Sequence, residues 1–589
     1  MVLRRFVLMF AVALASAIAP LGAWARSNDP DTALKGVIEE LDAARIAFDV
    51  PGMAVVVVVD GKVILAQGLG HRGLDDATLI DADTRFAIGS CSKAFTAMGA
   101  ALLAEDGKLS LTDRVAAHDP LLMLSQPGAL DRLTIADLLT QRSGLARHDF
   151  LWHARPDMTR AQFAAAQGVL AMQNTPGGRF GYTNSAIILA GRVIELRAGQ
   201  SWESFTIARI FAPLGMTRTN YSSAGLGADA NAARATKRAN GASRTVASRD
   251  ARLLGPAGAI NSTANDMGQW LLMLTNDGAL ANGQPLVRPE TLEALWTPIT
   301  GPERRPRGKP ANDDDVGGYA LGWRVGAWRG ERRISHSGAI DGFRARVTVF
   351  PDARVGIAVM ANLGPTQIPD FATRVLAERL LDLPRKTDLM AYANARREVE
   401  TAAIGKPAPP PRGRAARLGE KDPTLTPSAP LSALQGVYTH PAYGEIRIEP
   451  AAEAQSLRIV FGVLHGRLDP WRGESFIAIS DWPDDTLDEG EIAFRYDGAG
   501  AVTGFTAMID NDLAPIAFTR VGALPLPSPT DAELTALPEE APAAPIPGPG
   551  PAAMIVLALG LAVLAAGATW AWQQRLVRIA EARERPLRR

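Results

Sequence analysis

The chain has 589 residues, enough for about two to four domains, and its hydrophobic content of 47% can supply a large core. Basic and acidic residues both number 62, and no basic block with interleaved aromatic residues occurs in the body of the chain. Nucleic-acid binding is therefore not expected. The single cysteine, Cys91, excludes an intrachain disulfide and is expected to be a buried structural thiol rather than a reactive one.

The N-terminus predicts a secretory signal peptide over residues 1–25. Arg4 and Arg5 precede the apolar stretch Phe6–Ala19, and Ala23–Ala25 is a small-residue cleavage site. A retained membrane anchor is the alternative interpretation. If the signal is cleaved, the body of the protein leaves the cytoplasm.

The C-terminus predicts a membrane anchor. A Pro-rich linker over residues 523–551 leads to Ala552–Trp572, which contains no charged residue. This stretch is long enough to span a bilayer as a transmembrane helix, with a core helix as the alternative. Residues 573–589 form a basic tail, which the positive-inside rule places in the cytoplasm. The expected location is thus the cell inner membrane, with a single span and the folded body on the periplasmic side.

The first folded elements are predicted near residue 31. Asp31–Phe48 has helical periodicity, and the apolar run Gly52–Val59 indicates a strand. Asp60-Gly61 predicts a hairpin turn into the returning strand Lys62–Gln67.

A hydroxyl and an amine then occur three residues apart, at Ser90 and Lys93, before the almost wholly apolar stretch Ala94–Ala104. A helix that is apolar on every face lies in a core, and residues three apart on a helix share a face. A serine hydroxyl is a weak nucleophile until a base takes its proton, and a buried lysine can be that base. A serine N-cap with a solvated lysine is the alternative for this motif alone.

The middle of the chain is predicted to be mostly helical. Thr134 is placed to cap a short helix that ends at Thr140. His148 and His153 lack further ligands at metal-binding spacing, so no metal site and no cofactor are expected. 

A turn-rich loop over Asn174–Gly181 leads to Tyr182 and Asn184, which precede the predicted helix Ser185–Arg197. This placement suits a polar pair that points into a cleft. The alternative is a capping asparagine beside a packed tyrosine.

The second half of the domain returns to strands. Arg332–Gly338 is a predicted strand, and Ala345–Phe350 pairs with Val355–Ala361 in a hairpin. Pro369–Leu381 is a closing helix. Strands at both ends with helices between them predict one α/β domain over residues 31–385, in which helices flank an antiparallel sheet completed late in the chain.

Two further segments follow this domain. Residues 386–430 are predicted to be a linker, because their second part is rich in Pro, Arg and Gly. Residues 431–522 contain short alternating strands separated by turns, which is typical of a small β-barrel or sandwich.

In this order and on these elements, Ser90-x-x-Lys93, Tyr182-x-Asn184 and His336-Ser337-Gly338 resemble the motifs of the serine β-lactamase and penicillin-binding-protein superfamily. The likeness is to its class C-like branch, peptidase family S12, and covers about residues 32–381. The C-terminal β module resembles the small lipocalin-like domain appended to such hydrolases.

The resemblance implies a β-lactamase/transpeptidase-like fold and acyl transfer. Ser90 is expected to attack a carbonyl while Lys93 takes its proton, and Tyr182 is expected to pass a proton to the leaving group. The division of the base role between Lys93 and Tyr182 stays open. By similarity, Asn184 holds the substrate amide, and the backbone N–H groups of Ser90 and Ala339 stabilise the oxyanion. Substrate contacts are also expected from His336, Ser337 and Gly338.

One position departs from the family pattern. Penicillin-recognising members usually carry lysine where this chain has His336, and histidine is mostly neutral at pH 7. This favours peptide, D-amino-acid or ester substrates over β-lactams. Arg344 and Arg346 offer a replacement charge, although surface arginines exposed to solvent are the safer interpretation.

The sequence therefore predicts a membrane-anchored extracytoplasmic serine hydrolase of the D-Ala-D-Ala carboxypeptidase, D-aminopeptidase or esterase type. The alternative is a receptor or sensor that is acylated, or binds peptide or β-lactam, without efficient turnover. The expected partners are a small-molecule or peptide substrate and the membrane, and the oligomeric state is not predicted.

Overall fold

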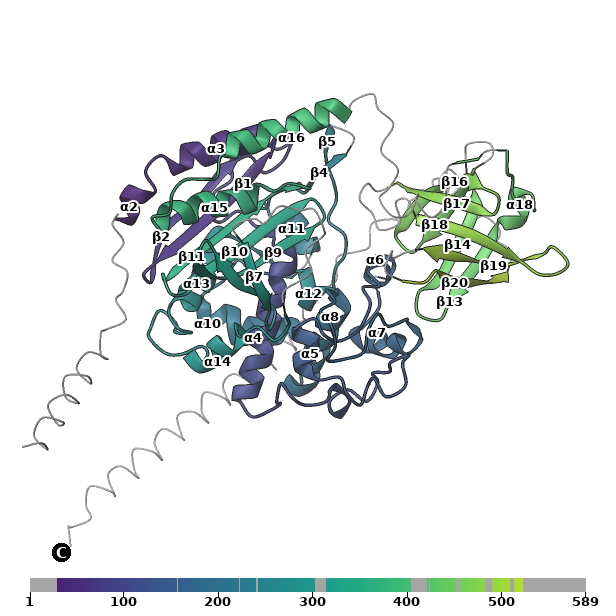
Figure 1. The fold of residues 1–589 in the computed structure, drawn as a ribbon, viewed down its shortest axis with the longest axis horizontal. Coiled ribbons are helices and arrows are strands. Elements are labelled where there is room, and N and C mark those ends of the chain that lie inside the picture. Colours follow the sequence, from purple (N-terminus) through teal and green to yellow (C-terminus); the bar gives the residue numbers. More distant parts are fainter. Residues whose placement is uncertain are drawn as a thin grey trace, which may run out of the picture. The chain divides into compact units, whose positions relative to one another are not determined.

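A seven-stranded antiparallel sheet, built from the two ends of residues 52–361, forms the centre of the first domain (Figure 1). Its order is β2-β1-β11-β10-β9-β8-β7, so the N-terminal hairpin joins strands that come almost 300 residues later. The strands are β1 (Gly52–Val59), β2 (Lys62–Gly70), β7 (Asp314–Tyr319), β8 (Arg324–Trp328), β9 (Glu331–Ile340), β10 (Phe343–Phe350) and β11 (Val355–Ala361).

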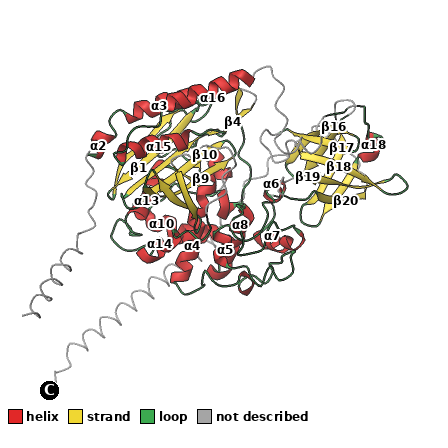
Figure 2. Ribbon diagram, viewed as in Figure 1, coloured by secondary structure: helices red, strands yellow, loops and turns green. Residues whose placement is uncertain are grey.

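The strand β1, next to the edge strand β2, is buried along its whole length because helices cover both faces of the sheet (Figure 2). Val56 and Val58 face one hydrophobic core, and Val55 and Val57 face the other. The sequence of a strand that is buried on both faces is an unbroken run of apolar residues, which explains the consecutive valines of β1. One face is covered by α3 (Val37–Ala47), α15 (Ile368–Leu380) and α16 (Leu389–Ala403).

The other face packs on the helical part of the chain, in which α4 (Ser92–Glu105) is central. Twelve of its residues, Ser92 to Leu103, are buried. Alongside α4 lie α8 (Asn184–Ala198) and α12 (Gly255–Gly258), and α13 (Ala264–Thr275) packs on β1 and β11.

The remaining helices of this domain are α2 (Pro30–Ala33), α5 (Ile135–Leu139), α6 (Phe150–Ala154), α7 (Arg160–Ala166), α9 (Trp202–Thr206), α10 (Ala212–Leu214), α11 (Ser223–Ala228) and α14 (Pro289–Leu295). Short turns of helix are η1 (Gly89–Cys91), η2 (Val115–Ala117), η3 (Gln167–Val169) and the π-helical η4 (Ile207–Phe211). Small strands are β3 (Phe86–Ala87), β4 (Thr236–Ala239), β5 (Ala242–Thr245), β6 (Asn261–Ser262) and β12 (Leu363–Gly364).

Two predicted elements differ from the structure by more than a few residues at a boundary. The helix predicted over Asp31–Phe48 is divided into α2 and α3, because Gly36 takes a left-handed φ of 71° between them. The first part of the predicted linker 386–430 is the helix α16. It is amphipathic, and Leu389 and Ala393 are buried against the first domain. The Pro, Arg and Gly residues that suggested a linker come after this helix in the sequence.

A closed eight-stranded barrel follows and is consistent with the predicted β module. The short helix α18 (Leu431–Leu434) precedes it. The barrel strands are β13 (Gly436–His440), β14 (Gly444–Pro450), β15 (Leu457–Phe461), β16 (Leu464–Arg472), β17 (Ser475–Ser480), β18 (Gly490–Tyr496), β19 (Val502–Met508) and β20 (Ile516–Gly522). Alternate residues point inward, among them Ile446, Ile448, Ile459 and Phe505, and these fill the interior with apolar side chains.

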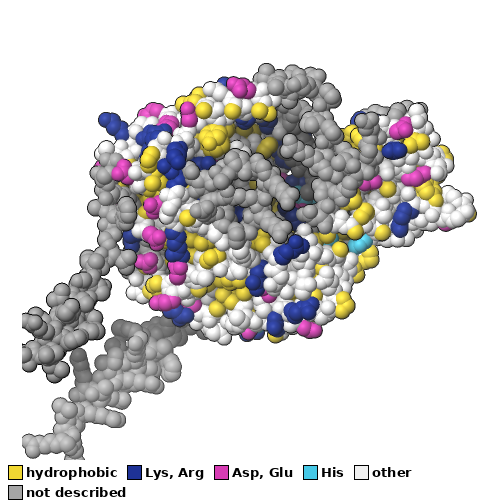
Figure 3. Space-filling view, viewed as in Figure 1, with side chains coloured by type: hydrophobic (Ala, Val, Ile, Leu, Met, Phe, Trp, Pro, Cys, Tyr) yellow, Lys and Arg dark blue, Asp and Glu magenta, His cyan; other side chains and the backbone are white. Residues whose placement is uncertain are grey.

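This computed structural model describes residues 29–155, 157–221, 223–239, 242–301, 314–403, 421–422, 424–451, 456–481, 490–508 and 513–522, all within a unit that ends at Leu524. The predicted signal peptide and the predicted transmembrane helix lie outside these ranges. Within them, no helix combines the length and the apolar character needed to cross a bilayer. Basic and acidic side chains are interspersed on the face shown in Figure 3, in keeping with the equal numbers of the two charges.

Candidate active site

Ser90 lies in the tight turn η1, which leads directly into the buried helix α4. Gly89 makes this turn possible: its φ is 51°, and a Cβ at this position would lie 2.6 Å from the backbone N of Ala339. Only glycine combines that backbone conformation with so close an approach. The turn therefore seats Ser90 directly against strand β9.

Lys93 is wholly buried, and its Nζ has three oxygen neighbours. Nζ lies 3.0 Å from Ser90 Oγ, 2.8 Å from Asn184 Oδ1 and 2.7 Å from the carbonyl oxygen of Ala257. As an ammonium group, Lys93 donates to all three oxygens. Once it releases one proton, the amine donates two hydrogen bonds and keeps one lone pair. The two carbonyl oxygens can only accept. The remaining direction therefore points at the Ser90 hydroxyl, which is the arrangement of a base about to accept a proton.

The helix α12 fixes one of these acceptors. Thr96 Oγ1 donates to the carbonyl of Pro256 at 2.7 Å, which holds α12 against α4. Gly191 in α8 permits the approach on the other side, because a Cβ there would lie 2.2 Å from Pro256 Cγ. The carbonyl of Ala257 is thus held in place by contacts with two neighbouring helices.

Tyr182 lies beside Lys93 and is half-buried in the wall of the cleft. Lys93 Nζ is 5.0 Å from the centroid of the Tyr182 ring, and the guanidinium of Arg324 is 5.9 Å from it. The ring also contacts His336 and Tyr319. The aromatic group therefore lies close to both Lys93 and Arg324, and it lines the same cleft as Ser90.

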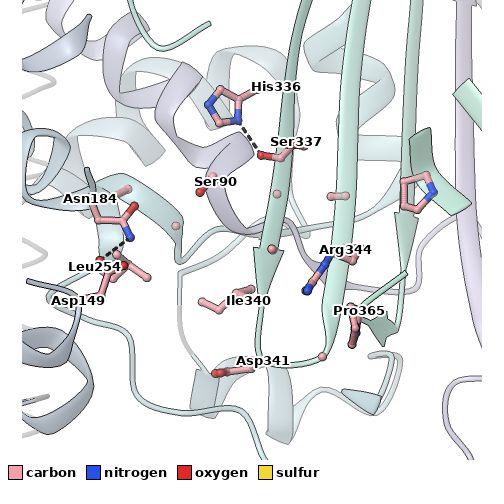
Figure 4. A pocket seen from close by; sticks show the side chains of 18 of the residues that line it. Ser90, Asp149, Asn184, Leu254, His336, Ser337, Ile340, Asp341, Arg344 and Pro365 are labelled. Carbon is pink, nitrogen blue, oxygen red and sulfur yellow. Dashed lines mark hydrogen bonds between the residues drawn. The ribbon is translucent and has the colours of Figure 1, made fainter. Parts of the chain in front are cut away.

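Asn184 is the first residue of α8, and Thr183 caps the helix by accepting a hydrogen bond from the Ser185 N–H at 3.1 Å. The Asn184 side chain donates from Nδ2 to Asp149 Oδ1 at 3.1 Å, while its Oδ1 accepts from Lys93. Figure 4 shows the hydrogen bond to Asp149. The side chain predicted to contact a substrate amide is therefore already bonded at both its nitrogen and its oxygen.

His336 is buried behind Ser90, with 2% of its surface exposed. Its Nδ1 donates to the carbonyl of Ser337 at 2.7 Å, so Nε2 accepts from the Tyr319 hydroxyl at 3.0 Å. Burial, and then the charges of Lys93 and Arg324, lower the pKa of His336 well below its ordinary value. The side chain is a neutral part of the wall, and it does not present a cation to a substrate carboxylate.

The second half of β9 offers an open backbone edge. This strand pairs with β8 only as far as Ser335, whereas its pairing with β10 continues to Ile340. A Cβ on Gly338 would lie 1.9 Å from the carbonyl oxygen of Ile88 and 3.2 Å from the backbone N of Ser90. The two segments that carry the predicted oxyanion donors, Ser90 and Ala339, therefore adjoin each other, and Ser337 and Ala339 are exposed beside them.

A cleft of about 720 Å³ opens over Ser90 and contains several charged side chains that the motifs did not predict. Its lining residues include five cations: Arg147, Lys237, Arg249, Arg324 and Arg344. Three carboxylates line it too: Asp149, Asp341 and Asp370. The safer interpretation of Arg344 and Arg346 as solvent-exposed arginines is wrong. Arg344 lines the cleft, and Arg346, half-buried, pairs with Asp370.

Cys91 and the two central histidines have other roles. Cys91 is 2% exposed, and burial raises its pKa to about 12, which confirms a structural thiol. His148 and His153 point to different partners: His148 Nδ1 lies 2.7 Å from the Tyr443 hydroxyl, and the His153 ring stacks on Trp152. Within the described ranges, no three His, Cys, Asp or Glu residues form a group that could hold a metal ion.

The chain combines a helical layer with an antiparallel sheet that joins N-terminal and late strands. At the start of a buried helix, Ser90 lies three residues before Lys93. These features are typical of a class of serine hydrolases in which a lysine takes the place of the usual histidine. The comparisons with known proteins agree. The family model Beta-lactamase matches residues 34–381, and the chain belongs to this family of β-lactamase-fold serine hydrolases. A second model, a domain of unknown function named DUF3471, matches residues 420–520. The barrel's likeness to lipocalins stays a resemblance.

Individual relatives are distant. The chain is 27% identical over 460 residues to the unguisins hydrolase ungD of Aspergillus violaceofuscus, covering 72% of this chain and 78% of that protein. It is 25% identical over 352 residues to the protein flp of Staphylococcus aureus, covering 58% of this chain and 65%, less than two thirds, of that protein. The octameric penicillin-binding protein homologue from Pyrococcus abyssi has the same fold. Its TM-score is 0.52 at 20% identity, over 81% of this chain and 97% of that one.

Proposed function

We propose that this protein is an extracytoplasmic serine hydrolase that cleaves amide or ester bonds through an acyl-Ser90 intermediate. The observation that carries the proposal is the geometry at Lys93: two fixed carbonyl acceptors and one hydroxyl surround a buried amine. This is the arrangement that a lysine base needs to activate a serine.

In the proposed reaction, Lys93 accepts the Ser90 proton as Oγ attacks the substrate carbonyl carbon. The C–O bond to Ser90 forms, and the carbonyl oxygen becomes an oxyanion that the N–H groups of Ser90 and Ala339 stabilise. As the oxyanion collapses, the bond from the carbonyl carbon to the leaving nitrogen or oxygen breaks, and the leaving group takes a proton that Tyr182, next to Lys93, is placed to deliver. Lys93 replaces that proton with the one taken from Ser90. Water then attacks the acyl carbon and gives one proton to this pair of side chains. The C–O bond to Ser90 breaks, Ser90 Oγ takes the proton back, and the acid leaves.

The open edge of β9 supports a substrate with an extended backbone. An extended peptide can add to an exposed strand edge through main-chain hydrogen bonds. Ser337 and Ala339 expose such an edge beside Ser90. A D-Ala-D-Ala carboxypeptidase, D-aminopeptidase or esterase activity is therefore proposed. β-Lactam hydrolysis is less favoured, because the neutral His336 stands where a fixed cation is usual.

Membrane anchoring is part of the proposal and rests on the sequence of the two termini alone. The apolar stretch Ala552–Trp572 and the basic residues after it support a single span at the inner membrane. Fractionation of cells, with protease added to one side of the membrane, tests this part independently of activity.

A substrate panel tests the reaction: nitrocefin, D-Ala-D-Ala peptides, D-amino-acid amides and short-chain esters, each with the wild type and Ser90→Ala. We expect turnover of at least one amide or ester by the wild type and none by the variant. A single acylation without turnover would instead support the acylated receptor. Equal turnover by Ser90→Ala would exclude the proposed nucleophile.

A further inference from the structure

The segment 147–154 connects the cleft to the barrel. Asp149 and Trp152 line the cleft, whereas His148 and Phe150, on either side of Asp149 in the sequence, contact the barrel. One short stretch of chain thus reaches both the candidate active site and a domain that contributes no catalytic group to it.

On the cleft side, Asp149 determines which way the Asn184 amide faces. Asp149 Oδ2 accepts from Arg147 at 2.6 Å, and its Oδ1 accepts from Trp152 Nε1 at 3.2 Å and from Asn184 Nδ2 at 3.1 Å. A carboxylate paired with a guanidinium accepts hydrogen bonds and does not donate them. Asn184 must therefore turn its NH₂ group to Asp149, which leaves Oδ1 facing Lys93.

On the barrel side, two contacts hold the same segment. His148 Nε2 donates to the carbonyl of Ala171 at 2.9 Å, and its Nδ1 is hydrogen-bonded with the Tyr443 hydroxyl at 2.7 Å. The ring of Phe150 stacks on that of Phe461, with centroids 5.7 Å apart and an interplanar angle of 20°. All of these side chains are buried.

The backbone at His148 needs such support. Its φ of 43° is left-handed, a conformation that non-glycine residues adopt only where their surroundings stabilise it. The hydrogen bond with Tyr443 is one such contact, and it acts one residue before Asp149. Loss of the barrel contact is therefore transmitted to the carboxylate through a single peptide unit.

We propose that Asp149 is a positioning residue that fixes the Asn184 amide toward Lys93, and that the barrel holds Asp149 in place through Tyr443 and Phe461. The barrel is then a structural component of the active site and more than a spacer. This inference rests on the proposed function, since it concerns the Ser90 and Lys93 pair.

The first test is a double-mutant cycle in the full-length chain, with an ester or amide that the wild type turns over. Asp149→Asn permits either orientation of Asn184 and is expected to lower kcat about 10- to 100-fold with little change in KM. In an Asn184→Ala background, Asp149→Asn is expected to cost nothing further, because its effect passes through the amide. If Asp149→Asn lowers kcat by the same factor in the Asn184→Ala background as in the wild type, the proposal is overturned.

The second test compares two buried tyrosines of the barrel. Tyr443→Phe removes the hydrogen bond to His148 and is expected to lower kcat about threefold to tenfold. Tyr438→Phe is the matched control, because its hydroxyl bonds inside the barrel segment, to the Leu434 carbonyl at 2.6 Å. It is expected to leave kcat unchanged. Equal effects of the two variants would refute a role for the barrel contact.

Phe461→Leu serves as a second variant if Tyr443→Phe does not fold, as judged by circular dichroism and gel filtration. It weakens the ring contact with Phe150 and is expected to lower kcat in the same way. Ser90→Ala separates this inference from the proposed function. If Ser90 is dispensable, the proposed function fails. If Ser90 is essential and the Asp149 cycle is additive, only this inference fails.

Discussion

The neutral, buried state of His336 makes a quantitative prediction about stability and pH. The pKa of this side chain in the folded protein lies well below its ordinary value, first because of burial and then because of Lys93 and Arg324. In the unfolded chain the imidazole titrates at about 6.5. Above that pH neither state is protonated, so folding stability does not depend on the group.

Below about pH 6.5, the unfolded chain binds a proton that the folded protein does not. Stability therefore rises with pH in this window and is lost as the pH falls, by up to about 1.4 kcal/mol per pH unit until the folded-state pKa is reached. At pH 5.5 the expected loss from His336 is about 1.4 kcal/mol. His153, whose pKa is also lowered well below the ordinary value by burial, adds a loss of the same sign.

Urea unfolding at pH 7.5 and pH 5.5, followed by tryptophan fluorescence, measures this difference. Between pH 7.5 and pH 5.5, the free energy of unfolding of the wild type should fall by about 1.4 kcal/mol more than that of His336→Gln. His465→Gln is the control, because His465 is exposed on β16, and it should match the wild type. If the free energy of unfolding of His336→Gln falls by the same amount as that of the wild type, His336 is not a neutral, buried histidine. The preference for substrates other than β-lactams would then lose its support.

Three further predictions concern the catalytic turn and the fold. Lys93→Met should lower kcat/KM by about 10²- to 10⁴-fold in steady-state assays while the protein stays folded, because it removes the base together with a buried charge. Gly338→Ala should abolish most turnover, since its Cβ meets the Ile88 carbonyl at 1.9 Å, whereas Gly498→Ala, with no atom within 4 Å, should turn over substrate normally. Thr134→Ala breaks the capping box of α5 and should reduce the free energy of unfolding by about 1 kcal/mol in the same urea titration.

Local patterns in the sequence predicted much of the fold. The valine run of β1, the hairpin at Asp60-Gly61 and the cap at Thr134 each depend on neighbours a few residues away. For the same reason the three-residue spacing of Ser90 and Lys93 was enough to place them together. The joining of N-terminal and late strands in one antiparallel sheet was also predicted, whereas the order of its strands and the strands β7 and β8 were not.

The contacts that complete the site were not predictable in this way. Asp149 and Asn184 are 35 residues apart, and Lys93 and the Ala257 carbonyl are 164 apart. The periodicity of a helix or strand relates residues only a few positions apart. It therefore does not predict such pairs, which form only when separate helices pack together. The sequence alone also could not orient Arg344, because its side chain faces the cleft only once β10 lies beside Gly364.

The role of Ser90 as the nucleophile is tested by mass spectrometry after reaction with a fluorophosphonate, which phosphonylates an activated serine with loss of fluoride. Fragmentation of the labelled peptide distinguishes Ser90 from Ser92, whose Oγ is buried and donates to the Gly89 carbonyl at 2.7 Å. We expect one adduct per chain, on Ser90, absent in Ser90→Ala and retained in Ser92→Ala. Labelling of Ser90→Ala at the wild-type level, or an adduct on Ser92, would contradict it.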